Sequence, residues 1–78
     1  KKTQSNAAEQ RQIKKDIVRL ERQIEKLKEL IATLEREQQE AGSDSGRLLE
    51  VTNQLEKAHK EFNTREEEWL EATLKVEP

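Results

Sequence analysis

The feature that most constrains this chain is a run of isoleucines and leucines that recur every three or four residues through its first half. The spacing alternates 4, 3, 4, 3, 4, 3, and the residues are Ile13, Ile17, Leu20, Ile24, Leu27, Ile31 and Leu34. This alternation is a heptad repeat, with isoleucines at position a from residue 17 onward and the other members at position d. Because water would otherwise cover so narrow an apolar stripe, it must be buried against a matching one. The pattern predicts a coiled coil.

Composition excludes several other classes of protein. The chain has 78 residues, of which 41% are charged and 31% hydrophobic, so a wide globular core is excluded. No apolar segment approaches the length of a membrane span, and nothing resembles a signal peptide. The absence of cysteine is consistent with a reducing compartment. Because the sequence begins with Lys1 rather than Met, we expect a piece of a larger protein.

A short polar segment, residues 42–46, is the one break in the helical pattern. Gly42 suits the left-handed conformation that follows a helix end, and Asp44 or Ser45 can cap the next helix. Five residues are short for a linker between domains but suit a tight turn between antiparallel helices.

The start of the first helix is also marked by a capping pattern. Asn6 followed by Glu9 resembles a capping box, with Ser5 as a rival N-cap. The elements predicted for the single domain, residues 1–78, are a helix over about 6–41, a turn over 42–46 and a helix over about 47–74.

The second helix carries a weaker heptad repeat that matches the first. Its a positions are Leu48, Leu55, Phe62, Trp69 and Val76, and its d positions are Val51, Ala58, Arg65 and Ala72. In an antiparallel pair, facing residues have numbers with a constant sum, and a sum of 89 sets every a against a d, with the turn at its centre. The fold class predicted is all-α: a two-helix antiparallel coiled-coil hairpin, monomeric. Arg65 is expected to extend outward along the seam toward Glu61 or Glu68.

The two ends of the chain carry opposite charge. Residues 1–28 contain nine Lys or Arg against four acids, whereas residues 61–77 contain six Glu against Arg65 and Lys75. The hairpin therefore sets basic residues such as Lys14 and Lys28 beside acidic ones near its open end. We expect these charges to favour the antiparallel register over a parallel homodimer.

No enzymatic motif is present. The chain lacks Cys and Tyr, has His59 as its single histidine, and shows no Gly-rich phosphate loop, no metal-ligand spacing and no nucleophile beside a base. The acidic run over 66–68 is expected to be a solvated face. We therefore expect a non-catalytic chain with no cofactor and no metal of its own.

The outer face of the first helix carries a row of cations at positions c and f, pointing away from the partner helix. The row, hereafter the basic ridge, comprises Lys15, Arg19, Arg22 and Lys26, with Arg11 near one end. Cations in a row on a rigid rod can follow phosphates, which is the sequence-independent part of nucleic-acid binding. The alternative is an ordinary charge network on an exposed helix, because Glu25 and Glu29 lie close by.

The chain resembles the C-terminal coiled-coil domain of bacterial ABC-F ATPases, the Uup-like group, from about Ala7 to Leu74. The segments that carry the resemblance are 8–11 (Ala-Glu-Gln-Arg), 14–15 (Lys-Lys), 19–24 (Arg-Leu-Glu-Arg-Gln-Ile) and 66–71 (Glu-Glu-Glu-Trp-Leu-Glu). The turn departs from the family, in which Pro and an aromatic residue are common there. The resemblance implies a cytoplasmic module at the end of a tandem ATPase whose ATP and Mg sites lie in domains absent from this chain.

The same resemblance implies an association with nucleic acid: DNA in Uup-like proteins and ribosomal RNA in their translation-factor relatives. The function expected is thus a non-catalytic nucleic-acid-binding accessory domain, with the parent ATPase domains as a further partner and no membrane contact. Two alternatives stay open, namely a structural or protein-interaction coiled coil and the tRNA-binding coiled-coil arm of an aminoacyl-tRNA synthetase.

Overall fold

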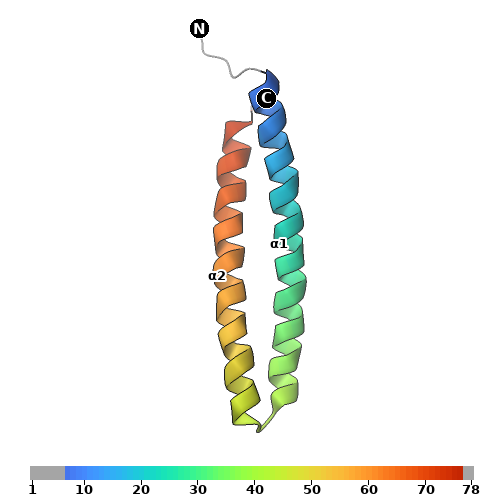
Figure 1. Cartoon of the computed structure of the whole chain (residues 1–78), viewed down its shortest axis with the longest axis vertical. Coiled ribbons are helices and arrows are strands. Elements are labelled where there is room, and N and C mark those ends of the chain that lie inside the picture. The colour runs from blue at the N-terminus through green and yellow to red at the C-terminus, as the bar shows by residue number, and fades with distance from the viewer. Residues whose placement is uncertain (1–6, 77–78) are drawn as a thin grey trace.

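The computed structural model describes residues 7–76 and shows two long helices joined by a tight turn (Figure 1). Helix α1 spans Ala7–Ala41 and helix α2 spans Ser45–Lys75. They lie side by side and antiparallel, with the first turns of α1 extending past the C-terminal end of α2, and form a rod of 63 × 15 × 15 Å. The all-α hairpin predicted from the heptads is confirmed. The proposed caps Asn6 and Ser5 lie outside the described residues.

The seam between the helices is built from the predicted heptad positions. The buried side chains, all at an a or d position, are Leu20, Leu27, Leu34, Ala41, Val51, Leu55 and Ala58. Every other predicted seam residue among the described ones is half-buried. Leu34, Leu55, Ala58 and Ile31 lie in one cluster, as the predicted register requires. On α2 no residue after Ala58 is buried, so the hairpin is packed more loosely toward its open end.

In this more loosely packed half, polar side chains beside the seam form hydrogen bonds. Arg65, the charged residue at a d position, is half-buried, and its Nη1 donates to Glu68 Oε1 at 2.9 Å, which confirms one of its two expected partners. Trp69 is also half-buried, and its Nε1 donates across the helices to Glu21 Oε2 at 3.1 Å. An indole placed in this way can pack its ring on the seam while its N–H reaches the surface.

The turn follows from two residues. Gly42 has a φ of +57°, in the left-handed region that favours glycine. Asp44 is the N-cap of α2, and its Oδ1 accepts a hydrogen bond from the Arg47 backbone N–H at 3.1 Å. The Asp44 backbone N–H donates to the Ala41 carbonyl at 2.9 Å, which closes the turn. Helix α2 therefore begins at Ser45, two residues before the predicted start.

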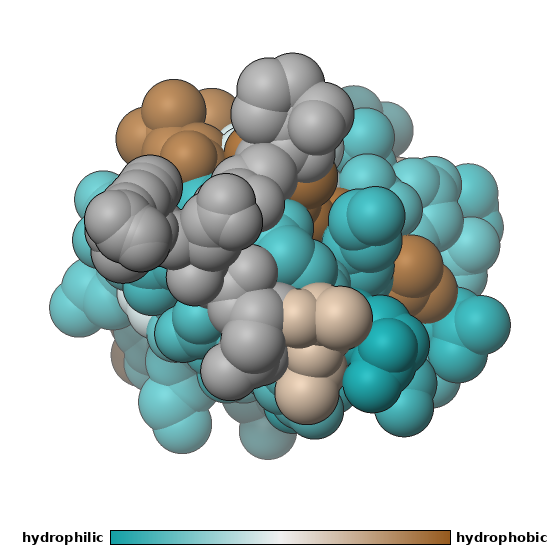
Figure 2. Space-filling view, turned by 90° about the horizontal axis from the view of Figure 1, so that it is seen from above, coloured by the Kyte–Doolittle hydropathy of each residue, from teal (hydrophilic) through white to brown (hydrophobic). Residues whose placement is uncertain are grey.

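The surface of the rod is mainly polar. Viewed from the end opposite the turn, hydrophilic residues cover most of the surface and hydrophobic ones show as separate spots (Figure 2). Within residues 7–76, neither helix has a stretch long and apolar enough to cross a membrane.

Replacing a buried seam residue by a charged one should unfold the hairpin. Leu27 is buried, and truncating such a leucine even to Ala costs about 2–5 kcal/mol. We expect Leu27→Lys to abolish the cooperative thermal transition seen by circular dichroism. The control is Leu49→Lys, because Leu49 is 64% exposed and its replacement should shift the transition little. A Leu27→Lys melt as cooperative and as high as that of the control would show that the seam is misplaced.

The two glycines provide a matched pair with opposite expected signs. A Cβ at either position meets only ordinary contacts, 3.9 Å at Gly42 and 3.8 Å at Gly46, so space does not decide the outcome. Gly42→Ala should cost about 1–2 kcal/mol because of the left-handed backbone, whereas Gly46→Ala, inside α2, should gain up to about 1 kcal/mol. Thermal or urea unfolding measures both, and equal effects of the two changes would contradict this account of the turn.

Candidate nucleic-acid interface

The structure places the whole basic ridge on the solvent side of α1. Positions c and f lie opposite the a and d positions of the same helix, so burial of the seam turns them outward. All five residues of the ridge are exposed: Arg11, Lys15, Arg19, Arg22 and Lys26. The side chains predicted from spacing to share a face are thus brought together on one.

Within the described residues, most of these cations have no carboxylate at ion-pair distance. The ion pair that involves the ridge joins Arg19 to Asp16 at 3.6 Å, and the Arg19 side chain is still 64% exposed. Asp16 also accepts a hydrogen bond from Gln12 Nε2 at 3.0 Å. Among residues 7–76, no ion pair within 4 Å involves Lys15, Arg22 or Lys26. The alternative to a phosphate-binding ridge, a charge network with Glu25 and Glu29, is not formed by ion pairs within 4 Å among the described residues.

A shallow depression on α1 adds two residues that sequence analysis left out of the ridge. Its lining residues are Lys14, Lys15, Val18, Arg19 and Arg22. Lys14 was expected to face the acids of the other helix. Val18, 46% exposed, is the one apolar side chain in the lining. The spacing from Lys14 to Val18 to Arg22, four residues each time, was the signal that could have identified both.

The cross-helix attraction expected from the charge asymmetry does not produce close ion pairs. In the described part of the chain, the two ion pairs within 4 Å are Asp16–Arg19 and Arg65–Glu68, each three residues apart on one helix. Cross-helix polar contacts are instead hydrogen bonds, such as Gln38 Nε2 to Thr52 Oγ1 at 3.2 Å and the Trp69–Glu21 contact. Lys14 and Lys28 therefore keep their charges available to solvent or to a ligand.

The described residues give no candidate metal site beside the ridge. Residues 7–76 contain no cluster of three His, Cys, Asp or Glu that could hold a metal ion. His59 is exposed beside the seam. The chemistry that the ridge can perform is electrostatic attraction of anions along an exposed helix.

Comparison of this chain with models of protein families, with curated proteins and with solved structures gives no match.

Proposed function

We propose that the hairpin is a non-catalytic nucleic-acid-binding module that contacts backbone phosphates through its basic ridge. The observation that carries the proposal is a row of exposed cations on one face of a rigid helix, most of them without a carboxylate partner among the described residues. The resemblance to the C-terminal domain of ABC-F ATPases supports the same function. It also supports a cytoplasmic location and placement at the end of a larger ATPase.

The spacing of the ridge suits a chain of phosphates. Helical rise places Lys15 and Lys26 about 16 Å apart along α1, with Arg19 and Arg22 between them. Successive phosphates of a duplex strand lie about 3.4 Å apart along its axis, so four side chains of this length can reach about four phosphates. Such contacts depend on the charge of the backbone and not on base identity. DNA and RNA duplexes both present that feature.

The acidic helix restricts how the rod can lie on a nucleic acid. Near the open end, α2 exposes Glu67, Glu68 and Glu71, which phosphates repel. The rod is also 15 Å wide, whereas the major groove of B-DNA is about 12 Å wide. We therefore propose contact along the backbone through α1, with α2 held away from the phosphates.

A protein-interaction role is the second candidate, and two exposed leucines favour it. Leu70 is 54% exposed and Leu74 is 84% exposed, both on α2 near its C-terminal end. Neither contributes to the seam. They can pack against an adjacent domain of a larger protein, and this contact is compatible with phosphate binding by α1.

Neutralising the ridge should remove binding while the fold survives. We expect the parent hairpin to bind a labelled DNA duplex or structured RNA weakly, and more weakly as salt rises. Changing Lys15, Arg19, Arg22 and Lys26 together to Gln should reduce the slope of log affinity against log salt by about 0.9 for each duplex phosphate that the variant no longer neutralises. Helicity should persist, because these residues lie outside the seam and Gln is a good helix former. Fluorescence anisotropy and circular dichroism measure the two effects.

The matched control removes the same number of charges elsewhere. Lys28, Arg47, Lys57 and Lys60 are all exposed and lie outside the ridge, and their joint change to Gln gives the same net charge as the ridge variant. The control variant should keep most of the binding. Equal loss of affinity in both variants would show that binding depends on net charge and not on the ridge. If the parent hairpin binds neither DNA nor RNA at low salt, the proposal fails and the protein-interaction role is the remaining candidate.

A further inference from the structure

One long flank of the hairpin, formed by positions g and c of both helices, has features that the phosphate-binding ridge does not explain. We call it the g flank. From residue 16 to residue 30 on α1 it comprises Asp16, Arg19, Gln23, Lys26 and Leu30, and from residue 54 to residue 75 on α2 it comprises Gln54, Lys57, Glu61, Thr64, Glu68, Glu71 and Lys75. Toward the turn the same positions include Thr33, Glu37, Glu40 and Glu50. Leu30 stands out as its exposed apolar side chain, at 46% exposure.

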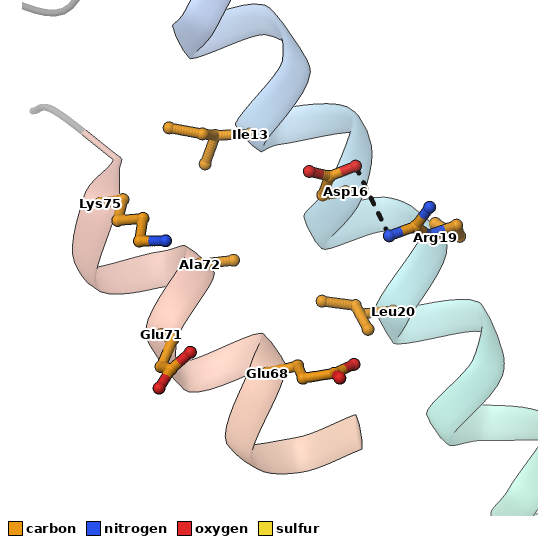
Figure 3. Close-up of a pocket in the computed structure, with 8 residues that line it drawn as sticks. All are labelled: Ile13, Asp16, Arg19, Leu20, Glu68, Glu71, Ala72 and Lys75. Atoms are coloured by element: carbon orange, nitrogen blue, oxygen red, sulfur yellow. Dashed lines mark ion pairs between the residues drawn. The ribbon is translucent and has the colours of Figure 1, made fainter. Parts of the chain in front are cut away.

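Two depressions open on this flank, each beside an alanine of α2. The first lies near the open end, where Ile13, Leu20 and Ala72 point into the space between the helices and charged side chains surround them (Figure 3). The second lies beside Ala58 and Leu34, with Leu30 at its edge. Alanine opposite isoleucine leaves each layer of the seam incompletely filled on this side, so both depressions have apolar floors.

The charges around these depressions are largely unpaired within one hairpin. Arg19 contacts Asp16, and Glu68 contacts Arg65. In the described residues, no ion pair within 4 Å involves Lys26, Glu61 or Glu71, nor Lys57 or Lys75. The flank thus carries separate groups of both signs that are open to a partner.

We propose that the g flank binds a second copy of this chain, with the two hairpins parallel and α1 of each beside α2 of the other. A half turn about an axis parallel to the rod produces this arrangement and preserves the height of each residue. Residues of α1 and α2 whose numbers add to about 89 lie at the same height, as Leu34 and Leu55 do. The same rule therefore predicts which residues of the two copies meet.

The residues that meet are complementary. Leu30 of one copy lies at the height of Ala58 of the other, over the second depression. Arg19 comes between Glu68 and Glu71 of the second copy. Opposite charges also meet where Lys26 approaches Glu61 and where Asp16 approaches Lys75. Symmetry makes each contact twice, which is why a second copy fits the flank.

The size and character of the surface indicate a weak, salt-sensitive dimer. The outline of one whole side of the rod, 63 by 15 Å, is comparable to the roughly 800 Å² per partner that a standard interface buries, and contact over the open half alone covers about half of that outline. Its apolar part is small, and near the turn Glu40 approaches Glu50 of the second copy, so attraction is concentrated in the open half. Complementary charges then contribute orientation more than affinity. At low protein concentration this dimer dissociates into the monomeric hairpin that the sequence predicts.

The basic ridge stays accessible in this dimer at its f positions. Lys15 and Arg22 point away from the g flank. The Lys15 and Arg22 of one copy lie on the outer edge opposite to those of the other copy, whereas Arg19 and Lys26 belong to both the ridge and the g flank. The dimer does not depend on nucleic-acid binding, and its tests contain no nucleic acid.

Sedimentation velocity over a wide concentration range tests the association. At about 0.05 M salt the mass should rise from 9.2 kDa toward that of a dimer, and at about 0.5 M salt the rise should be weaker. Leu30→Asp should raise the dissociation constant at least about tenfold. The control Leu49→Asp replaces a leucine that is 64% exposed at position b, outside the g flank, and should leave it unchanged. Circular dichroism should show equal helicity in both variants. A mass of one chain at every concentration would overturn the proposal.

Disulfide trapping tests the arrangement, because the chain has no cysteine of its own. Mixing Leu30→Cys chains with Lys57→Cys chains should give mainly the mixed disulfide, since these positions meet across the interface. Mixing Leu30→Cys with Glu71→Cys should not, because their heights differ by about 18 Å. A predominance of Leu30→Cys homodimers, or a dimer that survives Leu30→Asp unchanged, would refute this use of the flank.

Discussion

Burial of one narrow apolar seam is the interaction on which this molecule depends. Among residues 7–76 seven side chains are buried, and all of them lie on that seam. On a single helix in water this apolar stripe would stay exposed. Helices in proteins derive most of their stability from the packing of such a face against another element. The second half of the chain supplies the matching stripe, and the left-handed Gly42 lets it return. The fold is therefore a direct consequence of covering the stripe from within one chain.

The seam also explains why the rest of the surface can carry function. Positions b, c and f contribute little to packing, so the chain can place cations on α1 and carboxylates on α2 without loss of the core. Small residues in the seam do affect the surface. Beside Ala58 and Ala72 the seam is incompletely filled, and depressions open there on the g flank. The ridge therefore occupies helix positions that lie outside the seam, and the depressions of the g flank lie where small seam residues leave space.

The backbone was predictable from sequence because each part of it has a local cause. Heptad spacing fixed the seam and its register, and Gly42 and Asp44 fixed the turn. The start of α2 was placed two residues late, since Asp44 rather than a later residue is the cap. Close contacts of long side chains were less predictable. Position in a heptad fixes the height and face of Lys14 or Glu21, but the rotamer decides whether Glu21 accepts from Trp69 or pairs with a cation.

The ridge illustrates the same limit. Heptad spacing predicts the residues of the ridge, but it does not predict the depression in which Lys14 and Val18 lie beside them. That Arg19 would contact Asp16 and leave its neighbours unpaired depended on side-chain conformation as well. Sequence therefore predicts where charge lies on this rod, and the structure decides which charges remain open to a ligand.

The antiparallel register is the central claim, and a distance between two spin labels tests it most directly. Glu25 and Thr64 are exposed and lie at the same height on opposite helices, and cysteines introduced there would be the label sites in a chain that has none. Labelled chains diluted with unlabelled ones report the distance within one molecule. With helix axes about 8–10 Å apart, the hairpin predicts a label separation of about 20–25 Å. A separation near 58 Å, the length of a continuous helix between these residues, would contradict the account.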